Sequence, residues 1–153
     1  NSSWSGATMC HTGWDGTDYS EKRSFCARLS NLVDEGFFEK NHIDTIFVFG
    51  GLNDSGANSP LGEIKYGDKT HEEFFFVKPA FCYLIETIKK NCNNARIIIV
   101  IDSAVKPEIK DCMQEVSNHY GTEAIKIEPI DKLSGHPSVK GMKQIYIQIF
   151  EKL

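Results

Sequence analysis

Asn53 lies in a segment whose composition suits the binding of a developing negative charge. The segment, residues 50–54 (GGLND), directly follows a strongly apolar run. Glycine lets the backbone turn sharply at a strand end, so the amide NH2 of Asn53 could point into a cleft. A neutral donor suits an oxyanion that forms during a reaction, and one such donor typically contributes about 2.7–4 kcal/mol. The alternative is an ordinary turn, since Gly, Asn and Asp are the usual turn residues.

His136 is the histidine whose setting best suits proton transfer. It lies in residues 131–138 (DKLSGHPS), between the last predicted strand and the last predicted helix. Imidazole is the side chain best suited to moving a proton near neutral pH. Pro137 restricts His136 to extended geometry, which helps to fix its direction. A plain surface histidine is the alternative. The remaining histidines, which we expect to be solvated or to cap helices, are His11, His42, His71 and His119.

A third segment, residues 1–8 (NSSWSGAT), places Gly6 among small hydroxyl residues. Because Gly6 has no Cβ, a backbone N–H at this point could approach a substrate closely. Taken alone, the segment is better interpreted as a flexible terminus.

The apolar pattern predicts helices that alternate with buried strands. Predicted strands occupy residues 44–49, 96–101 and 124–128, and predicted helices begin near Phe25, Pro79, Ile109 and Ser138. Val139, Met142, Ile145 and Ile149 are expected on the inner face of the last helix. A long loop is expected over about 50–70, and Thr70 to Glu73 has capping-box spacing. This order predicts a single α/β domain over 1–153, with a parallel sheet whose ligands bind at the carboxyl ends of the strands.

Composition excludes several classes of protein. With 17 basic and 21 acidic residues the net charge is −4, which disfavours binding to a nucleic-acid backbone. No apolar run approaches the roughly 20 residues that a membrane span requires. Cys26, Cys82 and Cys112 lie at apolar helical positions and are expected to be buried thiols without a metal or redox role. Cysteine usage leaves the compartment open, and a secretory segment could precede Asn1.

Together the three segments resemble blocks II, III and V of the SGNH hydrolase superfamily, the GDSL-like lipases, esterases and acylhydrolases. In chain order they read Asn-x-x-x-Ser-Gly-x-Thr, Gly-x-Asn-Asp and His-Pro, and the segments 51–54 and 135–138 are the most specific. The resemblance covers nearly the whole chain. It implies a three-layer α/β/α, flavodoxin-like fold and a serine-dependent ester hydrolase without metal or organic cofactor. It also implies that the Gly6 N–H and Asn53 form the oxyanion hole and that His136 is the general base.

Two departures from the family pattern matter. The family's aspartate usually lies three residues before the histidine, where this chain has Leu133, so Asp131 is the expected orienting acid unless the site works as a dyad. The family nucleophile lies in Gly-Asp-Ser, which occurs nowhere in this sequence. We therefore expect a fragment whose nucleophile and first strands lie upstream of Asn1, and which is inactive alone. Ser3 is the alternative nucleophile.

The expected substrate is a small-molecule, glycan or lipid ester. A rival hypothesis is a non-catalytic module that binds carbohydrate or peptide, with Trp4, Trp14 and Tyr19 stacking on sugar rings. A nucleotide-binding function is disfavoured, because no glycine-rich phosphate loop joins a strand to a helix. In the family the first strand lies mid-sheet; without it, strand 44–49 is an open edge through which we expect self-association.

Overall fold

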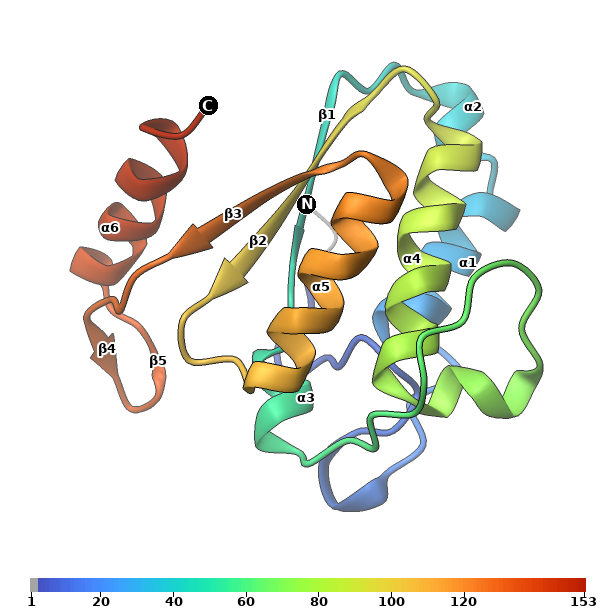
Figure 1. Cartoon of the computed structure of the whole chain (residues 1–153), viewed down its shortest axis with the longest axis horizontal. Helices are drawn as coiled ribbons and strands as arrows, with labels where there is room; N and C mark the ends of the chain where they lie inside the picture. Colours follow the sequence, from blue (N-terminus) through green and yellow to red (C-terminus); the bar gives the residue numbers. More distant parts are fainter. Residues whose placement is uncertain (1–2) are drawn as a thin grey trace.

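The computed structural model describes residues 3–153 and shows helices that alternate with parallel strands (Figure 1). The helices are α1 (Phe25–Asp34), α2 (Phe37–Lys40), α3 (Leu52–Gly56), α4 (Val77–Asn91), α5 (Pro107–Tyr120) and α6 (Val139–Phe150), with 3-10 turns η1 (Trp14–Gly16) and η2 (His71–Phe75). The strands are β1 (Thr45–Phe49), β2 (Arg96–Asp102), β3 (Glu123–Ile127), β4 (Lys132–Leu133) and β5 (His136–Pro137).

The main sheet confirms the predicted α/β class. Its three parallel strands lie in the order β1-β2-β3. Ile46 of β1 pairs with Ile97 of β2, and Val100 of β2 pairs with Ile125 of β3. The central strand β2 is buried on both faces, which explains why its sequence is an almost unbroken isoleucine run. β4 and β5 form a separate antiparallel hairpin.

Helices cover the two faces of the sheet unequally. One face carries the larger core, in which β2 residues pack with α1, α4 and α5, as Ile99 does with Phe81 and Met113. The other face carries a smaller cluster, in which Ile98 and Val100 pack with Ile145 of α6. Figure 1 shows this division, with α4 and α5 on one side of the strands and α6 on the other.

Local signals set several helix ends. Ser24 accepts a hydrogen bond from the Ala27 amide at the start of α1, and Ser138 does the same for Gly141 at the start of α6. Thr70 forms the expected capping box with Glu73. Gly121 ends α5 in the left-handed conformation, which favours glycine. Cys26, Cys82 and Cys112 are buried free thiols, as expected.

Two local expectations are wrong. The segment 50–70 is not entirely loop, because α3 begins at Leu52, with only two residues between it and β1. In α6, Ile145 is buried as expected, but Val139 and Met142 are exposed. The buried stripe instead contains Gly141, whose missing Cβ lets the helix approach the Asp131 carbonyl closely.

Within residues 3–153, no helix combines the length and the apolar character that crossing a lipid bilayer requires.

Candidate active site

Asn53 and the N-terminal loop meet at the carboxyl end of β1. Asn53 lies in the first turn of α3, and its Nδ2 donates a hydrogen bond of 2.8 Å to the carbonyl oxygen of Ala7. An amide NH2 has two hydrogens, so one remains for another acceptor. Gly6 directly precedes Ala7. The structure therefore brings together the two residues that the sequence predicts as oxyanion donors.

Asp54 holds the same loop from inside the protein. Its carboxylate, only 1% exposed, accepts the Met9 amide at 2.9 and 3.0 Å and the Cys10 amide at 3.3 Å. Burial raises the pKa of Asp54 to about 6, although the hydrogen bonds from Met9 and Cys10 act in the opposite direction. Each hydrogen bond to a charged acceptor contributes about 1.5–3 kcal/mol. Residues 7–11 are buried, so this part of the segment is not a flexible terminus.

The backbone conformation at position 6 favours glycine, because its φ is +72°, in the left-handed region. A Cβ there would also lie 2.7 Å from Nη2 of Arg23, which would have to move. That nitrogen also donates to the Ser5 carbonyl at 3.2 Å, and the guanidinium lies over the Tyr19 ring. Arg23 thus supports the outer side of the loop, while Asn53 and Asp54 hold its inner side.

His136 lies on the exposed β4–β5 hairpin, opposite Leu133 in its antiparallel register. Within residues 3–153 its imidazole makes no hydrogen bond or ion pair. The Asp131 carboxylate accepts a short hydrogen bond from the Ser138 hydroxyl, and the Asp131 carbonyl accepts the Ser138 amide. The pairing of His136 with Asp131, and the meeting of His136 with Asn53, therefore remain predictions.

Part of the predicted N-terminal segment lies outside the residues that the structure describes. Asn1, the first residue of the block II pattern, lies there, whereas Ser3 is described and exposed.

The arrangement of these segments has a match among known protein families. The sequence profile of the GDSL-like lipase/acylhydrolase family matches residues 1–153. The chain belongs to this family. A search of curated proteins found no match to this chain.

Two solved structures of candidate GDSL-like lipases resemble this family member closely. One, from Bacteroides uniformis, is 42% identical with a TM-score of 0.87, and the alignment covers 97% of this chain and 65% of that one. The other, from Bacteroides ovatus, is 39% identical with a TM-score of 0.86, and the alignment covers 96% of this chain and 67% of that one. The chain thus spans about two thirds of the length of these relatives.

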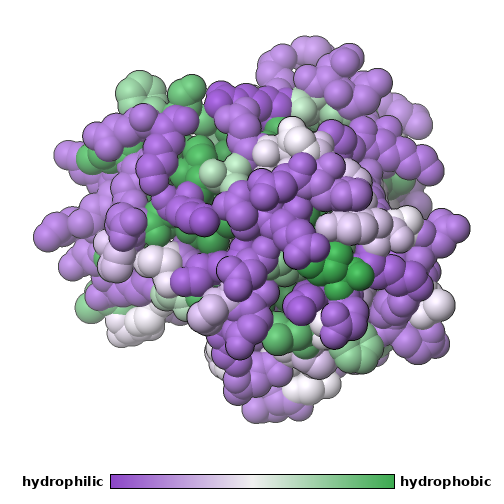
Figure 2. All heavy atoms as spheres, in the orientation of Figure 1, coloured by the Kyte–Doolittle hydropathy of each residue, from purple (hydrophilic) through white to green (hydrophobic). Residues whose placement is uncertain are grey.

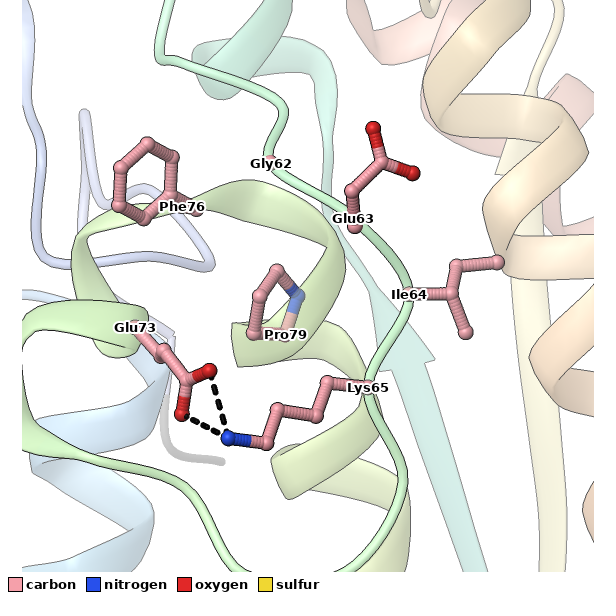
Figure 3. A pocket seen from close by; sticks show the side chains of 7 residues that line it. All are labelled: Gly62, Glu63, Ile64, Lys65, Glu73, Phe76 and Pro79. Carbon is pink, nitrogen blue, oxygen red and sulfur yellow. Dashed lines mark hydrogen bonds and ion pairs between the residues drawn. The ribbon is translucent and has the colours of Figure 1, made fainter.

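Two hollows of this GDSL-like chain lie away from the predicted site residues. The first, of about 350 Å³, lies between residues 62–65 and the start of α4, with Phe76 and Pro79 at its border (Figure 3). Lys65 bridges it by an ion pair with Glu73, at 2.7 and 2.8 Å. The second, of about 270 Å³, is bordered by His11, His71 and Cys26 among others.

Sequence reasoning missed two roles in this chain. The sequence pattern also fits Asp54 as an ordinary turn residue, but it is the buried anchor of the loop that carries Gly6. His11, expected to be solvated or capping, is buried, and its Nδ1 lies 2.8 Å from Oγ of Ser24. Burial is the main cause that lowers the pKa of His11. The signal available in the sequence is weak: Ala7, Met9 and Cys10 are apolar residues just before His11.

Proposed function

We propose that residues 1–153 provide the oxyanion hole and the general base of a serine-dependent ester hydrolase. The observation that carries this proposal is the double attachment of the Gly6 loop to the end of β1, through Asn53 and Asp54. Such attachment fixes a backbone N–H and a side-chain NH2 relative to each other before substrate binds. Preorganised donors of this kind are the main electrostatic source of catalysis in acyl transfer.

In the proposed reaction, His136 takes the proton of a serine hydroxyl as the serine oxygen attacks an ester carbonyl. The Gly6 N–H and the Asn53 NH2 donate to the resulting oxyanion. Collapse of the tetrahedral intermediate breaks the bond to the alcohol, which leaves with the proton from His136. Water then attacks the acyl-enzyme by the same route and releases the acid.

The nucleophilic serine is proposed to come from outside residues 1–153, because the sequence contains no Gly-Asp-Ser. Asp131 is proposed to orient His136, which requires its carboxylate to exchange Ser138 for the imidazole. Neither the formation of the acyl-enzyme nor its hydrolysis needs a metal or an organic cofactor in this proposal. The proposed substrates are carboxylic esters.

A chimera tests this proposal. It joins residues 1–153 to the part of the Bacteroides uniformis chain that the alignment leaves uncovered. We expect the chimera to hydrolyse p-nitrophenyl acetate and to react with a fluorophosphonate, and the chain alone to do neither. Asn53→Ala should lower kcat by about 10²–10³-fold, and His136→Ala by about 10⁴-fold or more.

His119→Ala is the matched control, because His119 is exposed on α5. Its ring stacks on Tyr66 and takes no part in the loop that carries Gly6. Equal activity in the parent and His136→Ala chimeras would contradict the proposed base. Turnover by the chain alone that is lost in Ser3→Ala but kept in Ser5→Ala would place the nucleophile at Ser3 instead.

A second candidate function is a non-catalytic glycan-binding module. Two exposed indoles in the N-terminal loop, Trp4 and Trp14, favour it, since such rings can stack on sugars. Tyr19 does not contribute, because it is buried. Glycan binding that persists in Asn53→Ala and His136→Ala would support this candidate.

A further inference from the structure

The indole of Trp14 lies beside both segments that carry the proposed oxyanion donors. A Cβ at Gly6 would lie 4.0 Å from Nε1 of this ring. A Cβ at Gly56 would lie 2.6 Å from Cη2, on the opposite edge of the same ring. Gly56 is the last residue of α3, the helix that carries Asn53. One flat ring therefore extends from the N-terminal loop to the helix of the second donor.

The turn that carries Trp14 is fixed by its own hydrogen bonds and by a distant segment. The Gly13 amide donates to the Thr17 carbonyl at 2.8 Å, and the Thr17 amide donates to the Trp14 carbonyl at 3.0 Å. The carbonyl of Thr12 accepts the Ser59 hydroxyl at 2.8 Å. Within residues 3–153 the indole remains 42% exposed. It is thus a contact surface that is ordered before a ligand binds, which lowers the cost of binding.

Arg23 borders the same glycine with hydrogen-bond donors. Its Nη2 would lie 2.7 Å from a Cβ at Gly6, and it donates to the Ser5 carbonyl at 3.2 Å. A guanidinium has five N–H donors, so this bond leaves others for the oxygen atoms of a ligand. Gly6 is therefore bordered by a flat aromatic ring and by a group of donors.

These two neighbours suit a carbohydrate better than a long hydrocarbon chain. A sugar has a face of C–H groups that can stack on an indole, and a rim of hydroxyl oxygens that accept hydrogen bonds. A hydrocarbon chain needs a continuous apolar wall, whereas the turn of Trp14, residues 13–17, reads GWDGT. This turn lies at the lower end of the molecule in Figure 1, and the same end of Figure 2 shows mainly hydrophilic and intermediate residues.

We propose that Trp14 determines the substrate class, because its ring stacks on the sugar of an O-acylated carbohydrate. The ester carbonyl of this substrate then lies at Gly6 and Asn53, and the Arg23 guanidinium donates to sugar hydroxyls. Hydrolysis releases the carboxylic acid and restores the free sugar hydroxyl. This inference rests on the proposed hydrolase function. It differs from a non-catalytic glycan module, because the stacked sugar positions an ester at the oxyanion donors.

Kinetics of the chimera described above test this proposal. The substrates are ethyl acetate, which has no ring, and the 6-O-acetyl esters of glucose, galactose and mannose. We expect Trp14→Ala to raise KM about tenfold for at least one acetyl sugar, because a stacking contact is lost. Its kcat with that sugar and its kinetics with ethyl acetate should change little, since the contact is made equally in the ground state and the transition state. Trp14→Phe keeps an aromatic ring and should retain most of the sugar binding.

Gly56→Ala is a second variant, which keeps the indole but displaces it. Alanine suits the helical backbone of α3, whereas its Cβ would lie 2.6 Å from the ring. It should raise KM for the acetyl sugars in the same direction as Trp14→Ala. The control is Phe37→Ala, which removes an exposed aromatic ring from α2, at the opposite end of the molecule in Figure 1, and should leave every KM unchanged.

Binding to residues 1–153 alone gives a readout that needs no turnover. The chain has two tryptophans, so two-dimensional NMR of the indole N–H groups resolves Trp4 and Trp14, and Trp14→Phe assigns them. Titration with the methyl glycosides of glucose, galactose and mannose should shift the Trp14 resonance to saturation with at least one of them. Arg23→Gln should weaken this binding.

The outcomes separate this inference from the function on which it rests. Equal losses with ethyl acetate and the acetyl sugars in Trp14→Ala would overturn it, because the ring would then only support the loop. Unchanged KM values for all sugars, or a Trp14 resonance that no sugar shifts, would also overturn it. A chimera that hydrolyses no ester, with a Trp14 resonance that sugars still shift, would instead contradict the hydrolase and leave the non-catalytic module.

Discussion

Asp54 shows how one buried carboxylate can set the position of a loop. Its two oxygens accept amides from residues 9 and 10, while its neighbour Asn53 holds residue 7. Replacement by alanine leaves the Met9 and Cys10 amides buried without an acceptor. An unsatisfied buried donor costs about 1–3 kcal/mol. Asp54 thus stabilises the fold and positions the loop of the proposed oxyanion hole at once.

The raised pKa of Asp54 predicts a specific pH dependence of stability. Its folded pKa is about 6 and its ordinary value is 3.8, so the folded protein binds this proton more tightly than the unfolded chain does. The stabilising contribution is complete below about pH 4 and is lost as pH rises through about 6, by about 3 kcal/mol. The substitution Asp54→Asn provides the comparison, because asparagine keeps an acceptor oxygen at this position but does not titrate.

Urea unfolding of the wild type and of Asp54→Asn at pH values from 4 to 7.5 measures this effect. The difference between their free energies of unfolding isolates Asp54, because other groups titrate alike in both. We expect the wild type to lose stability relative to the variant as pH rises. A difference that stays constant with pH would contradict the assigned pKa.

At the scale of the element, the loop between α3 and η2 is attached by a buried ion pair. The Lys69 side chain is 1% exposed and its Nζ lies 2.6 Å from Oε2 of Glu86 on α4. Glu86 also accepts the Gly67 amide at 2.9 Å and a short hydrogen bond from the Tyr120 hydroxyl of α5. These contacts fix the segment to two helices, in addition to the packing of Leu61, Ile64 and Tyr66 against the main core.

Removing one partner of this pair should be more damaging than removing both. Lys69→Met leaves the partly buried Glu86 carboxylate without its cation, so the loss should be smaller than the about 3–5 kcal/mol typical of breaking a fully buried pair. We expect Lys69→Met with Glu86→Gln to recover part of this loss. A double-mutant cycle by urea unfolding measures the coupling, and limited proteolysis within residues 62–70 reports on the loop. Additive losses in the cycle would show that the pair is not coupled.

The sequence allowed the elements to be predicted better than their contacts. Periodicity located β1, β2, β3 and the four long helices, because burial of one face dictates where apolar residues recur. Which flank of α6 is buried could not be predicted, since Met142 and Ile145 are both apolar and only tertiary packing distinguishes them. The meeting of Gly6 with Asn53 followed from the family resemblance. The anchoring by Asp54 did not, because an Asp after Asn in a glycine-rich segment also fits an ordinary turn.

For the whole molecule, the unequal cover of the sheet predicts unequal sensitivity to truncation of its side chains. Ile99 lies on the face covered by α1, α4 and α5 and is fully buried, so Ile99→Ala should cost about 2–5 kcal/mol. Phe47 is half exposed on the open face, so Phe47→Ala should cost clearly less, although it removes more atoms. Urea unfolding of both variants measures these losses of stability. Comparable losses would contradict the unequal cover of the two faces of the sheet.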